Sequence, residues 1–435
     1  MNVSRLDGRA LACLWGVALF TPSLRGYIGT IGAILVNGGL LALAVLIVAW
    51  CGVRIRFVDE GERTLALLVL VCLVYYMVAI TFSTTFLAED VIFRDLFELH
   101  KPVLHAASFL LASLTIATPA DAERFRRILR WCFVLIVGVS ILQLVAPPAF
   151  AQLYTKSANI RAGRLAAPFG NPYDYGFAVS LFAYYFLFRY LERSGLKDLA
   201  ALAVALMMIV LTQSRTAVIT LGFALAVLVP AVVWLRHREA LSRLEIPPGV
   251  LRYGLLVLAV VAAGVVLVVK FRHEVAYLVG GIQALILRGE QSSLDVRLGQ
   301  LEQTFELANQ SILVALFGNG ISKSGMEFLE SGYAFYLFRF GVLGLVVIFI
   351  LPLVVVTGRL LQALVVRPER MDALAAAVLV WLASLFVASM GNNFTEQPRL
   401  SFMYYFMLGF ALRWAAMALA DRSGAERTAV REAVG

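Results

Sequence analysis

Long, continuous apolar runs dominate this 435-residue sequence and leave few folds open to it. A helix needs about 20 apolar residues to cross the hydrocarbon core of a bilayer. Because the runs do not alternate in polarity, they predict helices and exclude a closed β-barrel. Twelve runs of roughly this length occur, at residues 10–24, 29–50, 64–82, 102–118, 128–147, 172–189, 198–213, 216–235, 251–270, 332–357, 373–390 and 401–419.

The overall balance of residue types agrees with this prediction. The chain is 61% apolar and only 15% charged, whereas soluble domains are about 45–50% apolar and about 25% charged. A soluble enzyme, a disordered chain and a fibrous protein are therefore excluded. We expect an all-α, polytopic integral membrane protein with about 12 transmembrane helices, forming a single transmembrane domain over residues 1–435.

The distribution of basic residues predicts how the helices are oriented. The net charge is +9, which in a soluble protein would suggest a nucleic-acid partner. If the N-terminus is cytoplasmic, however, most of the 37 Lys and Arg residues fall in cytoplasmic segments, and each such segment has at least two. Cytoplasmic loops of membrane proteins carry this excess. We therefore expect both termini in the cytoplasm, membrane lipid as the surroundings, no nucleic-acid partner, and a first apolar run retained as a helix.

The longest segment outside the predicted spans covers residues 271–331 and lies on the outer side of the membrane in this topology. Apolar residues recur there at spacings of 4, 3, 4 and 3 from Leu294 to Ala308. This spacing predicts an amphipathic helix over 293–309, lying along the outer membrane face or over a cavity. The run Gly318–Asn319–Gly320 predicts a chain break before the tenth span.

Several kinds of chemistry have no residues to support them. None of the four His residues has a Cys, Asp or Glu at metal-ligand spacing, and no Gly-rich nucleotide loop is present. The four Cys residues lie in or beside apolar runs and are expected to be small buried side chains. We therefore expect no metal, no cofactor and no nucleotide.

Arginines on the outer side are the main candidates for function. Arg161 and Arg164 precede the sixth run, Arg215 lies in the short turn between the seventh and eighth runs, and Arg297 lies in the loop helix. A guanidinium stays charged and its planar fork of donors suits phosphate oxygens, so several together would bind a diphosphate. Snorkelling to lipid headgroups is an equal alternative for most of them. Function is favoured for Arg215, because its tight turn restricts solvation.

A carboxylate beside the tenth span is the candidate base. Glu330 lies two residues before Gly332, where it would accept a proton from a hydroxyl or simply favour the positive end of a helix. Taken alone, the residue favours the second role. Most other outer acidic residues, among them Asp95, Glu98 and Asp174, are expected to be solvated loop charges. Nearby aromatic residues, including Tyr333, would stack on sugars or form an interfacial belt, which is the commoner role.

Four stretches, taken in order, resemble one known family. They are Arg164–Tyr175 (RLAAPFGNPYDY), Ser214–Ala217, Asp295–Gly320 and Glu330–Leu345. Together with the twelve-span layout and the long loop between the ninth and tenth spans, they resemble the bacterial O-antigen polymerase and O-antigen ligase superfamily. The resemblance covers roughly residues 155–350.

This resemblance implies a metal-independent glycosyltransferase in the bacterial inner membrane with its active site facing the periplasm. Donor and acceptor would be glycans on undecaprenyl diphosphate, and a chain-length regulator and a flippase of the same pathway would be partners. The arginines would hold the diphosphate leaving group. The implied catalytic residues are Glu330, Arg215 and Arg297, with Asp295 and Glu327 as alternatives to Glu330 as the base. The candidate substrate-binding residues are Arg164, Arg161, Asn171, Tyr333 and Arg339.

Two alternatives to a polymerase remain. Ligases of this family place a His near the entry to the tenth span, but this chain has no His after His273 and Glu330 occupies the comparable region. This favours a polymerase of O-antigen, capsule or exopolysaccharide repeat units over a ligase that transfers glycan to lipid A core. A lipid-linked oligosaccharide flippase would need charge-lined access from both leaflets, and inverted repeats would support it. The sequence shows neither.

Overall fold

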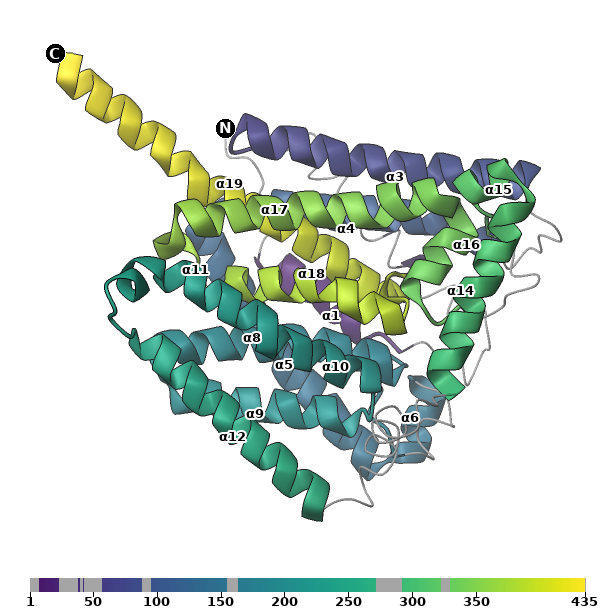
Figure 1. Ribbon diagram of the computed structural model, residues 1–435, viewed down its shortest axis with the longest axis horizontal. Coiled ribbons are helices and arrows are strands. Elements are labelled where there is room, and N and C mark those ends of the chain that lie inside the picture. Colours follow the sequence, from purple (N-terminus) through teal and green to yellow (C-terminus); the bar gives the residue numbers. More distant parts are fainter. Residues whose placement is uncertain are drawn as a thin grey trace.

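Helices form all the regular structure in the described part of the chain (Figure 1). The computed structural model describes residues 8–22, 38–39, 42, 57–87, 95–154, 163–270, 292–321 and 329–434. In chain order the helices are α1 (Gly8–Phe20), α3 (Glu60–Phe86), η2 (Asp95–His100), α4 (Lys101–Thr115), α5 (Pro119–Val145), α6 (Pro147–Leu153), α8 (Pro172–Arg193), α9 (Leu196–Leu211), α10 (Arg215–Phe223), η3 (Ala224–Leu228), α11 (Val229–Ser242), α12 (Pro248–Lys270), α14 (Ser292–Gln310), α15 (Ile312–Phe317), α16 (Gly332–Gly344), η4 (Leu345–Ile350), α17 (Leu351–Val366), η5 (Pro368–Arg370), α18 (Ala373–Gly391), η6 (Phe394–Glu396) and α19 (Pro398–Val434).

The predicted all-α membrane architecture is confirmed at this level. Eleven of the predicted apolar runs coincide with helices, while the run at 29–50 lies almost entirely outside the described residues. The number of twelve spans stays a prediction. Within the described residues, six helical segments are long and apolar enough to cross a membrane: Glu60–Phe86, Pro119–Val145, Arg215–Ser242, Gly332–Val366, Ala373–Gly391 and Pro398–Ala420.

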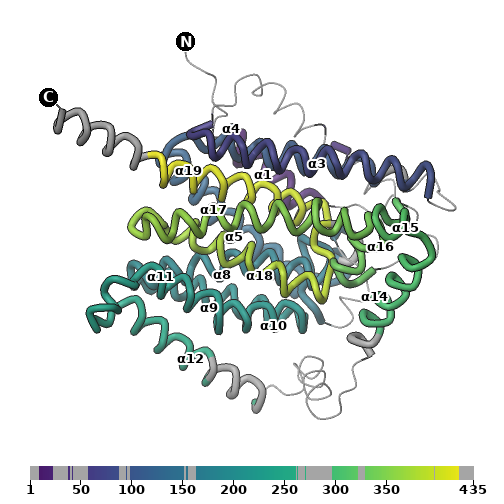
Figure 2. Tube along the Cα trace, turned by 45° about the horizontal axis from the view of Figure 1, so that its top comes forward, coloured from purple at the N-terminus to yellow at the C-terminus, as the bar shows by residue number. Residues whose placement is uncertain are grey.

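The long helices lie side by side and alternate in direction, so the bundle has two distinct ends. We call the end where α8, α10 and α16 begin and α18 finishes the site end, and the other the opposite end. In Figures 1 and 2, α14, α15 and α16 lie across the site end, on the right of both views. The amphipathic helix predicted over 293–309 is confirmed as α14, and it packs against α15 and α16.

Buried ion pairs join the helices at the opposite end. Arg413 of α19 donates to both carboxylate oxygens of Glu62 in α3, at 3.0 and 2.9 Å, and both residues are buried. A paired buried charge is tolerated, whereas removing one partner costs about 3–5 kcal/mol. Three further pairs at this end are Arg126–Asp372 at 3.1 Å, Arg189–Asp198 at 3.1 Å and Arg359–Asp59 at 3.0 Å.

Two of the long helices contain a wide π-turn just before a proline. The turn η3 precedes Pro230 and the turn η4 precedes Pro352. Proline has no N–H and its ring collides with the carbonyl four residues earlier, and a π-turn relieves this locally. The predicted span at 332–357 is also interrupted, because Gly341 adopts φ 65° and ψ −169° within α16.

Candidate functional site

The last turn of α18 touches the first turns of two other helices at the site end. A Cβ added at Gly391 would lie only 2.3 Å from Thr216 Oγ1 of α10. A Cβ at Gly332, where α16 begins, would lie 3.1 Å from Ser389 Cβ of α18. Helix N-termini carry N–H groups without intrahelical partners and a partial positive charge. The N-termini of α10 and α16 therefore lie here next to the C-terminus of α18, which carries a partial negative charge.

Helix α8 joins the same group through a buried polar contact. Asn392, just after α18, donates from Nδ2 to Asp174 Oδ1 at 3.0 Å, and Asp174 is completely buried. The expectation that Asp174 is a solvated loop charge is therefore wrong, because the first turn of α8 packs against α18. Asn171, a predicted substrate-binding residue, caps α8 by accepting the N–H of Tyr173 at 3.0 Å.

The close approach of α10 and α18 gives a direct test of this arrangement. We expect Gly391→Leu to destabilise the protein by about 1–3 kcal/mol, because its side chain would collide with Thr216 and push the two helices apart. Thermal unfolding of the purified protein in detergent measures the effect. Gly222→Leu in α10 is the matched control, since a Cβ at this position would meet open space. Equal melting temperatures for the two variants would contradict the packing described.

The predicted tight turn that carries Arg215 is confirmed. Helix α9 ends at Leu211 and α10 begins at Arg215 itself. Ser214 caps α10 by accepting the N–H of Ala217 on its hydroxyl oxygen at 3.2 Å. The turn therefore fixes Arg215 at the positive end of a helix, between α8 and α18.

Arg164 lies against this same turn. Its Nε donates to the carbonyl of Thr212 at 3.0 Å, and its guanidinium lies 5.1 Å from the centre of the Tyr173 ring. The backbone of Arg164 is fixed by the buried side chain of Gln143, which donates to the Arg164 carbonyl at 2.9 Å and accepts the N–H of Ala167 at 2.8 Å. The structure thus brings Arg164 and the Arg215 turn together, although 50 residues separate them in sequence.

Two of the residues predicted to be catalytic form an ion pair with each other. Arg297 Nη2 of α14 lies 3.1 Å from Glu330 Oε2, with 14% of the arginine side chain and 45% of the glutamate side chain exposed. Gln300, also in α14, accepts the backbone N–H of Glu330 at 3.0 Å. These contacts attach α14 to the chain just before α16, and they leave the carboxylate open to solvent on one side.

Arg339, predicted to bind substrate, is buried in α16 and contacts the segment that follows α15. Only 4% of it is exposed; its Nη1 donates to the carbonyl of Ile321 at 2.6 Å, and its guanidinium lies 5.6 Å from the Phe335 ring centre. The chain around Gly318 runs so close to the Arg339 backbone that a Cβ at this glycine would lie 2.4 Å from the Arg339 carbonyl carbon. Arg339 therefore fixes the segment after α15 to α16.

The other predicted residues divide between described and undescribed parts of the chain. Tyr333 points into the bundle and donates from its hydroxyl to the carbonyl of Phe386 at 2.8 Å. Arg161 and Glu327 lie outside the described residues, and so does the side chain of Asp295.

Arg399 is a further basic residue at the site end, outside the set predicted from the sequence. The guanidinium of Arg399, in the first turn of α19, lies 5.5 Å from the Tyr154 ring centre and donates to the carbonyl of Thr21. Tyr154 in turn donates from its hydroxyl to the carbonyl of Phe20 at 2.7 Å. Burial raises the pKa of the Tyr154 phenol, and the charge of Arg399 offsets part of that rise. The sequence signal for Arg399 was its place directly after a proline, at the start of an apolar run.

Two acidic residues near the start of α4 are also more buried than expected. Asp95 is 1% exposed, and Glu98 forms an ion pair with Lys101 in which both side chains are largely buried. The expectation of solvated loop charges is therefore wrong here too. The short helix η2 packs against α3 and α4, which removes these residues from water.

The site end combines guanidinium groups, helix N-termini and one half-exposed carboxylate. In the described part of the chain, no group of three or more His, Cys, Asp or Glu side chains is arranged to hold a metal ion. The arrangement is suited to an anion with several oxygens, such as a diphosphate, and the carboxylate is able to accept a proton.

No protein-family model matches the chain, and a search of curated proteins finds no significant match.

Proposed function

We propose that this protein is a glycosyltransferase of the bacterial inner membrane that polymerises oligosaccharide repeat units carried on undecaprenyl diphosphate, with its active site facing the periplasm. The observation that carries the proposal is the contact between Arg164 and the Arg215 turn, beside the N-termini of α8 and α10. Positive charge fixed in advance is what a diphosphate leaving group requires, since negative charge grows on it as the glycosidic bond breaks.

The proposed reaction needs one nucleophile, one leaving group and one base. A hydroxyl oxygen of the acceptor glycan attacks the anomeric carbon of the donor, and the bond from that carbon to the diphosphate oxygen breaks with its electron pair. Arg164 and Arg215 stabilise the departing lipid diphosphate. Glu330 accepts the hydroxyl proton. If the donor diphosphate competes with Glu330 for Arg297, donor binding would free the carboxylate for this role.

The arrangement of charge supports the proposed orientation. The ion-paired arginines Arg126, Arg189 and Arg359 belong to segments that the positive-inside rule assigns to the cytoplasm, and they lie together at the opposite end. The site end would then face the periplasm, where lipid-linked repeat units would be the substrates. In this proposal the chain has twelve spans, and both termini lie in the cytoplasm. A chain-length regulator and a flippase of the same pathway are its partners.

Product formation from one lipid-linked substrate tests the proposal. Purified protein in nanodiscs receives one undecaprenyl-diphosphate-linked repeat unit, with no nucleotide added, and the products are separated by size. A ladder of chain lengths is expected. Transfer only to added lipid A core would identify a ligase instead. Movement of the substrate across a vesicle bilayer without any new glycosidic bond would identify a flippase.

Removal of divalent metals is expected to leave the ladder unchanged. Guanidinium groups and helix N-termini supply the positive charge that a bound metal supplies in other glycosyl transfers. The same assay is run with an excess of chelator and, in parallel, with added Mg²⁺. A loss of product on chelation that Mg²⁺ restores would contradict the proposed mechanism.

A further inference from the structure

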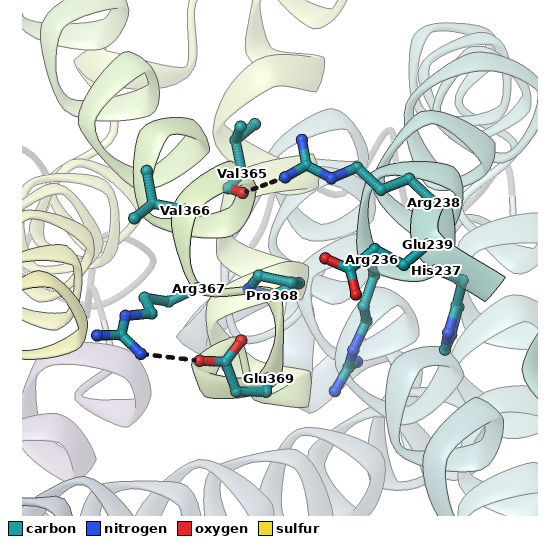
Figure 3. Close-up of a pocket in the computed structure, with 9 residues that line it drawn as sticks. All are labelled: Arg236, His237, Arg238, Glu239, Val365, Val366, Arg367, Pro368 and Glu369. Carbon is teal, nitrogen blue, oxygen red and sulfur yellow. Dashed lines mark hydrogen bonds and ion pairs between the residues drawn. The ribbon is translucent and has the colours of Figure 1, made fainter. Parts of the chain in front are cut away.

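A pocket of about 770 Å³ opens at the opposite end of the bundle, between the end of α11 and the segment where α17 passes into η5 (Figure 3). It contains none of the residues proposed for glycosyl transfer. Its lining carries charges of both signs, from Arg236, Arg238 and Arg367 and from Glu239 and Glu369. A pocket with both signs of charge at a helix end suits a ligand that is itself a zwitterion.

Two of these arginines already have carboxylate partners. Arg236 pairs with Glu192 of α8 at 2.8 Å. Arg367 pairs more loosely with Glu369, at 3.5 Å, and both of these side chains are partly exposed. The Arg236 charge is therefore balanced within the protein, while the Arg367 guanidinium keeps donors available on the open side of the pocket.

The remaining two charged residues, Arg238 and Glu239, are exposed and form no ion pair among the described residues. Arg238 donates to the backbone carbonyl of Val365 at 3.1 Å, and no described carboxylate lies within ion-pair distance of it. Glu239 likewise has no cationic partner among the described side chains. Figure 3 shows its carboxylate among the lining residues of both helices. The pocket thus offers one guanidinium and one carboxylate to a ligand.

Backbone carbonyl groups add to the attraction of the pocket for a cation. Helix α17 ends at Val366, so its C-terminus lies at this pocket, whereas α11 continues past the lining residues to Ser242. Helix C-termini carry carbonyl groups without intrahelical partners and a partial negative charge. A ligand with an ammonium group would be stabilised by these carbonyls together with Glu239.

The surface beside the pocket suits acyl chains. Trp234 lies one helical turn before Arg238 and is 57% exposed, and Leu361 lies one turn before Val365 and is 41% exposed. Residues four apart lie on the same face of a helix. Exposed apolar side chains therefore lead from the charged pocket along α11 and α17 toward the middle of the bundle. Trp at the level of the headgroups is typical of a membrane boundary.

We propose that this pocket binds a membrane lipid with a phosphoethanolamine headgroup. Arg238 and Arg367 bind the phosphate oxygens, and the primary ammonium donates to Glu239 and to carbonyls at the end of α17. The acyl chains lie against the apolar faces that carry Trp234 and Leu361. The lipid would join α11 to α17, which are held at this end by only a few direct contacts such as Arg238 to Val365.

Native mass spectrometry of the purified protein tests the proposal. The protein is incubated with equal amounts of phosphatidylethanolamine, phosphatidylcholine and phosphatidylglycerol, and retained lipids are counted. Retention of phosphatidylethanolamine is expected to exceed that of phosphatidylcholine by about tenfold, because a choline group has no N–H to donate and a hydrogen bond between charged groups is lost. Glu239→Gln should remove most of this preference, and Arg238→Ala should lower the retention of both lipids.

Matched controls separate the pocket from general surface charge. Arg193→Ala at the end of α8 and Glu245→Gln after α11 change exposed charges outside the pocket lining, and both should leave the preference unchanged. Stronger retention of phosphatidylglycerol than of phosphatidylethanolamine, or an unchanged preference in Glu239→Gln, would overturn the proposal. If soluble glycerophosphoethanolamine, which has no acyl chains, competed for the pocket as well as phosphatidylethanolamine does, the role given to the acyl chains would be overturned.

Discussion

Replacing Arg215 by Ala should abolish chain extension while leaving the protein folded in the membrane. Arg215 lies at the first position of α10, against the turn that Arg164 also contacts. Removing one fixed donor to a developing negative charge lowers turnover by about 100- to 1,000-fold. Arg215→Lys should also lose most activity, because a point charge does not replace a planar fork of donors. The length distribution of lipid-linked products measures both effects.

An arginine directly after the same helical segment provides the control. Arg243 follows α11, is exposed and lies at the opposite end. Arg243→Ala should extend chains at the wild-type rate. Membrane content and melting temperature of each variant show whether a loss of activity comes from misfolding. Near-normal extension by Arg215→Ala would exclude the diphosphate role.

Replacing Glu330 by Gln should lower turnover far more than donor binding. A positioned general base contributes about 100- to 10,000-fold to a rate, and glutamine keeps the size of the side chain without accepting a proton. Single-turnover kinetics and donor affinity are measured on the same preparation. A loss of donor affinity with turnover intact would assign Glu330 to binding.

The ion pair between Arg297 and Glu330 makes a double-mutant experiment informative. If Glu330 served only to hold Arg297 in place, Glu330→Gln and Arg297→Gln would have the same effect, and combining them would add little. If Glu330 is the base and Arg297 binds the donor, the two single variants should differ, with turnover reduced in the first and donor affinity in the second. Gln303→Ala serves as a neighbouring control, since Gln303 is an exposed residue of α14, the helix that carries Arg297.

Much of the helical framework could be predicted from local sequence. Apolar runs long enough to cross a bilayer have few structures available, because each backbone N–H and C=O needs an internal partner there. The tight turn before Arg215, the amphipathic helix α14 and the break at Gly318 also follow from short patterns. They were predicted to within a residue or two.

The surroundings of individual charges were not predictable in the same way. Asp174 and Asp95 were expected in water and are buried, the first by packing of α8 against α18 and the second by packing of η2 against α3 and α4. Arg339 and Arg164 were both candidate substrate-binding residues, yet one fixes a segment to α16 while the other lies against the Arg215 turn. Side-chain partners depend on which helices become neighbours.

The sequence by itself therefore determined the fold class, most helix positions and the unequal distribution of basic residues, since hydrophobic length and loop charge act locally. Only the tertiary structure decided which residues meet. It joined Arg297 to Glu330, brought Arg164 to the Arg215 turn and gathered helix N-termini around Gly391. These contacts depend on close packing between segments separated by tens to hundreds of residues, and no local pattern encodes such packing.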